Sequence, residues 1–220
     1  SGVQFLTGYP QISLFTFYIV LIFVLYKLFW ILKAKEYSKA FNNGLYLVFS
    51  GIVVVLISAV QLIPSLLFSR HSGRSGGVKE EFASTFSLPP ENTLSLLYPN
   101  ILGDGVNAFS GTNVAYWGRW LSWEIMPYAS VLALLFFVIS FTWKDKKIRL
   151  LTMFVFLALL CAYGRYGSLY DFAYHYLPGF SMFRVPGRFL VPFAFGLCLL
   201  VSYFIAQARD NAVAKEMSGK

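Results

Sequence analysis

A continuous apolar stretch at residues 45–68 contains no charged side chain. A helix of roughly 20 apolar residues crosses the hydrocarbon core of a bilayer, and this stretch is long enough to do so. Its Pro64 lies near one end, where neighbouring groups or interfacial water can satisfy the carbonyl that proline leaves free. The whole chain shares this bias, since 57% of its residues are hydrophobic and 13% are charged, against about 25% charged in soluble domains. The sequence therefore excludes soluble Rossmann, P-loop and metalloprotease folds and indicates a membrane protein.

Four further apolar segments predict further spans. The first is interrupted only by Lys27, whose ammonium can reach an interface through its flexible stem. The fourth span of the series has only a short apolar core at 150–163, but Arg149 and Tyr166 can anchor its two ends. We therefore expect an all-α, polytopic transmembrane helical bundle with about five spans, at residues 12–32, 45–68, 127–143, 149–166 and 188–208. It would form a single integral membrane region over residues 1–220, with outer loops at 69–126 and 167–187.

The lysines are distributed unevenly around these spans. If the N-terminus is outside, the first and third connections and the C-terminal tail are cytoplasmic, and Lys79 is then the one lysine in an outer loop. Cytoplasmic loops carry the excess of basic residues in membrane proteins. The sequence thus predicts a multi-pass protein of the cell membrane with its N-terminus outside and its C-terminus in the cytoplasm. This distribution also accounts for the net charge of +8 without a nucleic-acid partner.

Arginines instead gather on the outer side. Arg184 and Arg188 flank a Pro-Gly turn at the start of the last span, so both guanidinium groups can reach the same interfacial depth. Guanidinium groups bind phosphate oxygens through two parallel hydrogen bonds. The pair is a candidate site for a lipid phosphate, although ordinary anchoring to lipid headgroups explains the same positions.

The long outer loop carries a second candidate site. A short amphipathic helix is expected at 93–98, between prolines, and Glu91 suits its start. Aromatic residues then cluster before the third span, as is typical of a membrane interface, but flat rings also pack against pyranose rings and isoprenoid chains. A possible sugar or lipid platform consists of Glu91, Asp104, Trp117, Arg119 and Trp120. The chain has no nucleotide-binding, zinc-protease or Cys-x-x-Cys motif, and no acidic pair whose spacing requires a metal.

Several short motifs occur in an order that resembles a known family. They are GYPQ at 8–11, SLPPEN at 87–92, LYPN at 97–100, YWG at 116–118, LPGF at 177–180 and FRVPGRF at 183–189. The ordered set, and FRVPGRF most of all, resembles the bacterial YfhO-like membrane proteins of the GT-C class of polytopic glycosyltransferases.

This resemblance implies many membrane helices with extended outer loops, and partners that are membrane lipid and a polyprenyl-phosphate-linked sugar. The sugar would pass to a cell-envelope acceptor on the outer face, with Arg184 and Arg188 as phosphate ligands. A divalent metal is possible by the same resemblance, although the cofactor is unknown and the sequence shows no ligands for a metal. The catalytic acid of the class usually lies in an earlier outer loop, and no residue here matches it, so the catalytic residue is unknown. We therefore expect a fragment that is inactive alone.

The alternative is a non-enzymatic polytopic membrane protein, either a transporter component or an envelope-assembly scaffold. Transporters commonly place ionisable residues or broken helices at the bilayer midplane. Apart from Arg149, Arg165 and Arg188 at the ends of spans, Lys27 is the one charge within the spans, and the chain has no obvious internal repeat, which disfavours a transporter.

Overall fold

The computed structural model describes residues 2–71, 78–103, 116–119, 122–125 and 128–218. These residues form helices joined by turns, with no strand among them, so the predicted all-α class is confirmed. They separate into two compact units, residues 1–77 and 78–220. Each unit is described by itself.

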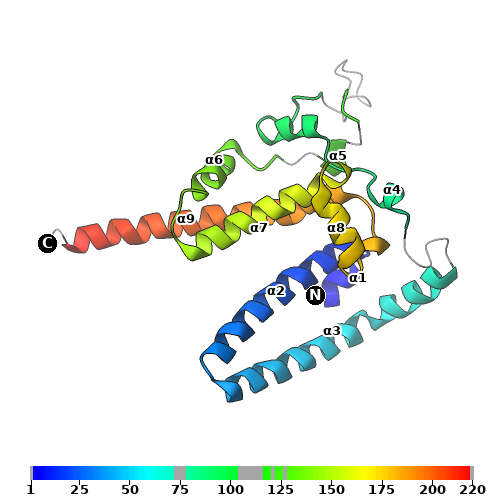
Figure 1. The fold of residues 1–220 in the computed structure, drawn as a ribbon, viewed down its shortest axis with the longest axis horizontal. Helices are drawn as coiled ribbons and strands as arrows, with labels where there is room; N and C mark the ends of the chain where they lie inside the picture. The colour runs from blue at the N-terminus through cyan, green and yellow to red at the C-terminus, as the bar shows by residue number, and fades with distance from the viewer. Residues whose placement is uncertain (1, 72–77, 104–115, 120–121, 126–127, 219–220) are drawn as a thin grey trace. The chain divides into compact units, whose positions relative to one another are not determined.

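The first unit contains α1 (Gly2–Leu6), α2 (Pro10–Lys33) and α3 (Tyr37–His71) (Figure 1). Proline at the first position of α2 is favourable, because its fixed φ suits a helix and its missing N–H has no partner there. The helix ends at a left-handed residue, Lys35, with φ of 58°. The N–H of Glu36 donates to the carbonyl of Ile31 at 3.2 Å, which satisfies an open end of α2 as the chain turns into α3.

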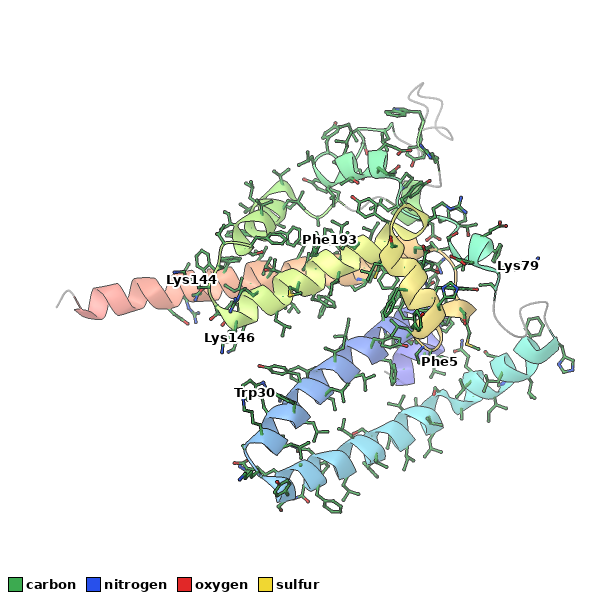
Figure 2. The ribbon with its side chains drawn as sticks, in the orientation of Figure 1. Phe5, Trp30, Lys79, Lys144, Lys146 and Phe193 are labelled. Carbon is green, nitrogen blue, oxygen red and sulfur yellow. The ribbon has the colours of Figure 1, made fainter. Side chains whose placement is uncertain are left out.

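Where the structure describes it, the second unit contains three helices of 10 or more residues and several shorter helical segments. They are α4 (Glu80–Ala83), η1 (Pro90–Leu96), α5 (Ser122–Ile125), α6 (Val131–Ser140), α7 (Lys146–Ala162), η2 (Gly164–Tyr166), α8 (Ser168–Tyr176), η3 (Phe180–Met182), η4 (Pro186–Phe189) and α9 (Leu190–Ser218). In Figure 1, α7 lies alongside α9 over most of the length of α7. Phe193 of α9, labelled in Figure 2, is fully buried, and its ring meets that of Phe137 on α6 edge-on with centroids 6.5 Å apart.

The helices α7 and α9 run antiparallel. Lys144 and Lys146 mark the start of α7 (Figure 2), where the Nε1–H of Trp143 donates to Oε1 of Gln207 at 3.1 Å. The other end of α7 packs against η4, which leads into α9. Between these ends, Gly196 lets the helices approach closely, because an added Cβ would lie 2.7 Å from Cγ2 of Val155.

Among the residues that the structure describes, three helices are long and apolar enough to cross a membrane: Pro10–Lys33, Tyr37–Phe68 and Pro186–Asp210. They contain the spans expected at 12–32, 45–68 and 188–208, and they are the evidence for a membrane-embedded protein. Each helix extends beyond the predicted limits, since a helix continues into the interface for as long as its backbone remains hydrogen-bonded.

The other two expected spans are not confirmed. The helix within 127–143 is α6, with 10 residues, and the helix within 149–166 is α7, with 17. At about 1.5 Å per residue these helices measure about 15 and 26 Å, less than the roughly 30 Å of hydrocarbon in a bilayer. The charged start of α7, which includes Lys146, shortens its apolar part further.

Candidate functional site

Motifs that lie far apart in the sequence meet where α7 ends and α9 begins. The N–H of Leu88 donates to the carbonyl of Ala162 at 2.8 Å. The N–H of Arg165 donates to Oγ of Ser87 at 3.0 Å. The N–H of Gly187 donates to the carbonyl of Phe86 at 3.1 Å. We call the residues at 84–92, 124–125, 163–166 and 185–189 the motif cluster.

Two glycines permit this close packing. Gly164 has φ of 50°, and an added Cβ would overlap Oγ of Ser87 and lie 2.8 Å from the ring of Pro186. An added Cβ on Gly187 would lie 2.8 Å from the carbonyl oxygen of Phe86. The motif cluster therefore requires glycine at both positions, because side chains of Ser87 and Pro186 crowd Gly164 and the backbone of Phe86 crowds Gly187.

Two residues of the motif cluster have backbone conformations that L-residues rarely adopt. Phe86 has φ of 57° and Val185 has φ of 70°. Such conformations cost about 1–3 kcal/mol each and persist where the surrounding structure holds them. Here Val185 is buried, with 2% of its surface exposed, and the hydrogen bond from Gly187 holds the carbonyl of Phe86. Strain of this kind is common at binding and catalytic sites.

Arg188 forms a two-point ion pair within the motif cluster. Its Nε donates to Oε2 of Glu124 at 3.2 Å, and its Nη2 donates to Oε1 at 3.1 Å. The two side chains are 21% and 23% exposed. This pair joins the segment before α6 to the start of α9, and it neutralises the charge of Arg188.

The side chain of Arg184 lies in a different environment from that of Arg188. Its guanidinium lies over the ring of Phe82, 5.2 Å from the ring centroid. The residue is exposed and makes no ion pair with a described residue. The two arginines of the expected phosphate site therefore contact different partners, and Arg184 is the one with an accessible charge.

Part of the expected platform is brought together. Nε of Arg119 lies 2.7 Å from Oε1 of Glu91, and its guanidinium lies 5.8 Å from the ring centroid of Tyr166. The carboxylate of Glu91 raises the pKa of Arg119. Trp117 is 66% exposed beside this pair in the chain. Asp104 and Trp120 lie outside the described residues.

The expected short helix is found as η1, displaced toward the N-terminus from 93–98. It packs against the rest of the unit through side-chain hydrogen bonds. Nδ2 of Asn92 donates to the hydroxyl of Tyr116 at 3.1 Å, and the hydroxyls of Thr93 and Tyr163 are 2.7 Å apart. Asn92 is fully buried. The helix thus lies against the C-terminal end of α7.

No family model, curated protein or solved structure matches the chain. The resemblance to the YfhO-like proteins therefore rests on the motifs and stays a prediction. Within the part of the chain that the structure describes, no three His, Cys, Asp or Glu residues lie close enough together to hold a metal ion. His175 approaches one carboxylate, that of Glu80, at 3.9 Å.

Three contributors to the motif cluster were not predicted from the sequence: Glu124, Ser87 and Arg165. The ion pair of Glu124 with Arg188 spans 64 positions, and the hydrogen bond between Ser87 and Arg165 spans 78. A single sequence carries no periodicity over such distances. For Glu124 and Arg188, the available signal was that each residue lies beside the predicted outer end of a span.

Proposed function

We propose that this chain is part of a membrane glycosyltransferase that moves a sugar from a polyprenyl-phosphate carrier to a cell-envelope acceptor on the outer face. The observation that supports the proposal is the meeting of SLPPEN and FRVPGRF, the motifs that resemble such enzymes, in one cluster at the start of the apolar α9. The head of a span lies near the depth of lipid phosphates, which is where the phosphate of a membrane-anchored carrier would lie.

The reaction requires a positively charged group at the depth of the lipid phosphates. In the transfer, the bond between the anomeric carbon and the phosphate oxygen breaks, and the acceptor hydroxyl oxygen bonds to the same carbon. The acceptor loses its proton to a base, and the bonding electrons leave with the phosphate. A fixed positive charge beside the leaving phosphate stabilises the transition state.

Arg184 fits this role best, because its guanidinium is exposed and makes no ion pair with a described residue. Arg188 would contact the phosphate only by exchanging the carboxylate of Glu124 for it. We therefore propose that Arg184 is the main phosphate ligand and that Arg188 chiefly positions the turn between them. Trp117 offers an exposed ring to a sugar or to the isoprenoid chain.

In the proposed topology, the motif cluster is outside and the turn before α7 is cytoplasmic. The antiparallel packing supports opposite sides for these two regions, since the start of α7 lies beside Gln207 in the later part of α9. Because α7 runs beside α9 as far as the level of Gln207, α7 should cross much of the same membrane depth as α9. The lysines at 144, 146 and 147 would then obey the positive-inside rule.

Lipid binding by the purified chain in detergent tests the proposal. We expect polyprenyl monophosphate to bind about tenfold or more tightly than the polyprenol of the same length, since one charge-assisted hydrogen bond contributes roughly 1.5–3 kcal/mol. The variant Arg184→Gln should lose this preference. The control Arg149→Gln, which changes an exposed arginine at the start of α7, should keep it. Equal binding of the two lipids by the unmodified chain would favour a non-enzymatic membrane protein instead.

A further inference from the structure

A groove of about 290 Å³ lies between α2 and α3. Its walls are mainly apolar and include Phe23, Leu28, Ile31 and Leu47. The volume is close to the lower end of the roughly 300–1,000 Å³ found for ligand pockets. It therefore has room for a segment of one lipid chain.

Among the described residues, one charged side chain lines this groove. Lys27 places its Nζ 4.8 Å from the ring centroid of Phe23, and it makes no ion pair with a described residue. No acidic residue in the described part of the chain lines the groove. An ammonium group within an apolar helix is costly unless an anion or water meets it, so the groove is complementary to a ligand with an apolar body and a negative head.

The depth of Lys27 fits a phospholipid headgroup. Lys27 precedes Lys33, the last residue of α2, by about 9 Å along the helix axis at about 1.5 Å per residue. The flexible lysine stem can carry the ammonium over much of that distance toward the interface. Trp30 lies between them near the turn into α3 (Figure 2), as aromatic residues do at the level of lipid headgroups.

The opposite wall leaves space at the same level. Asn43 and Gly44 of α3 line the groove across from α2. Apart from the neighbouring residues and local backbone of α3, no atom of a described residue lies within 4 Å of the position that a Cβ on Gly44 would occupy. The absence of a side chain there keeps the groove open.

We propose that the groove between α2 and α3 binds one anionic phospholipid, with an acyl chain along the apolar wall and its phosphate at Lys27 and Asn43. This site is independent of the glycosyltransferase proposal, since it uses none of the residues of the motif cluster.

Native mass spectrometry of the purified full chain tests whether the positive charge of Lys27 contributes to lipid binding. After incubation with phosphatidylglycerol or phosphatidylcholine, the chain should retain phosphatidylglycerol preferentially. Lys27→Gln should reduce this preference about fivefold, which corresponds to about 1 kcal/mol for one basic residue near an anionic lipid surface. The control is Lys33→Gln, because Lys33 also contacts an aromatic ring, that of Trp30 at 5.1 Å, but does not line the groove.

A second pair of variants tests whether the lipid needs the open space at Gly44 in the groove. Gly44 and Gly51 both belong to α3 and both have open space where a Cβ would be added, but only Gly44 lines the groove. Gly44→Leu should reduce retention of both phospholipids, and Gly51→Leu should not. Circular dichroism checks that each variant folds, and if Gly44→Leu does not, the comparison of Lys27→Gln with Lys33→Gln decides.

Three results would overturn the proposal. The first is equal retention of the two phospholipids by the unmodified chain. The second is an equal loss in Lys27→Gln and Lys33→Gln. The third is a cross-linked dimer that Gly44→Leu abolishes, because a second copy of the chain would then be the occupant of the groove.

Discussion

The guanidinium of Arg188 and the carboxylate of Glu124 face each other through two contacts, of 3.2 and 3.1 Å, across 64 positions of the chain. Both side chains are mostly buried. The pair closes the motif cluster on the side of α5 and links the segment before α6 to the turn that begins α9. An arginine that the sequence suggests for ligand binding therefore also has a structural partner.

This ion pair should couple the two residues energetically. Glu124→Gln and Arg188→Gln should each lower the free energy of unfolding by about 1–3 kcal/mol, because each leaves a partly buried charge without its partner. The double variant should cost less than the sum of the two. Unfolding in detergent mixtures measures the cycle, with the exposed pair Glu36–Lys39 (44% and 70% exposed) as a control expected to show little coupling. Additive losses for Glu124 and Arg188 would show that the contact contributes nothing.

Two neighbouring glycines should respond differently to alanine. In Gly164→Ala the new Cβ meets Ser87 and Pro186, and the residue keeps a positive φ. A loss of about 1–3 kcal/mol in stability is expected from overpacking and strain. In Gly167→Ala the nearest atom is 3.6 Å away and φ is −147°, so little change is expected. Similar melting temperatures for the two variants would contradict the close packing described for the motif cluster.

The pH dependence of the free energy of unfolding should show the effect of the buried hydroxyl of Tyr170. Its hydroxyl donates to the carbonyl of Ala83 at 3.3 Å, and burial, with smaller effects of Tyr174 and Asp171, raises the pKa of Tyr170 above its ordinary value. The unfolded chain, with a tyrosine pKa of about 10, then loses this proton first as pH rises. The stabilisation is complete below about pH 10 and declines as pH rises toward the folded pKa.

Alkaline titration followed by tyrosinate absorbance checks this sign. The variant Tyr170→Phe should lack the latest part of the titration and should lose about 1 kcal/mol of stability at neutral pH from the missing hydrogen bond. The control Tyr176→Phe changes a residue that is 72% exposed and should leave the late part in place. Loss of the late part from Tyr176→Phe alone would contradict the assignment.

Labelling from the two sides of the membrane tests the topology. In a variant whose two native cysteines are replaced by alanine, Lys146→Cys and Ser168→Cys each place a thiol at an exposed position. The thiol at 168 should react with an impermeant reagent from outside, and the thiol at 146 only after permeabilisation. Labelling of both from outside would mean that α7 does not cross the membrane.

The sequence predicted the fold where one property runs continuously along the chain. The membrane-length helices α2, α3 and α9 follow from long apolar windows and need no knowledge of tertiary contacts. Helix limits were less accurate, because they depend on local hydrogen bonds. The start of α7 is an example: the carboxylate of Asp145 accepts from the N–H groups of Lys147 and Ile148 at 2.7 and 3.2 Å, which starts the helix before the apolar segment.

The candidate site was predictable only in part. Glu91 and Arg119 were both proposed and do form an ion pair. Arg184 and Arg188 were grouped because they flank one turn, but their side chains have separate partners, Phe82 and Glu124. Side-chain direction depends on the left-handed φ of Val185 within that turn, and no propensity predicts such a conformation for a β-branched residue.

Sugar transfer by charge-preserving variants tests the central claim most directly. The donor is a polyprenyl-phosphate-linked sugar, and the readout is release of polyprenyl phosphate by membranes that contain the whole enzyme of which this chain is proposed to be part. Arg184→Lys should reduce transfer by about tenfold or more, because lysine cannot reproduce a two-point bond to phosphate, while membrane insertion stays unchanged. Full transfer by Arg184→Lys would contradict a phosphate site at Arg184 and favour simple anchoring to lipid headgroups.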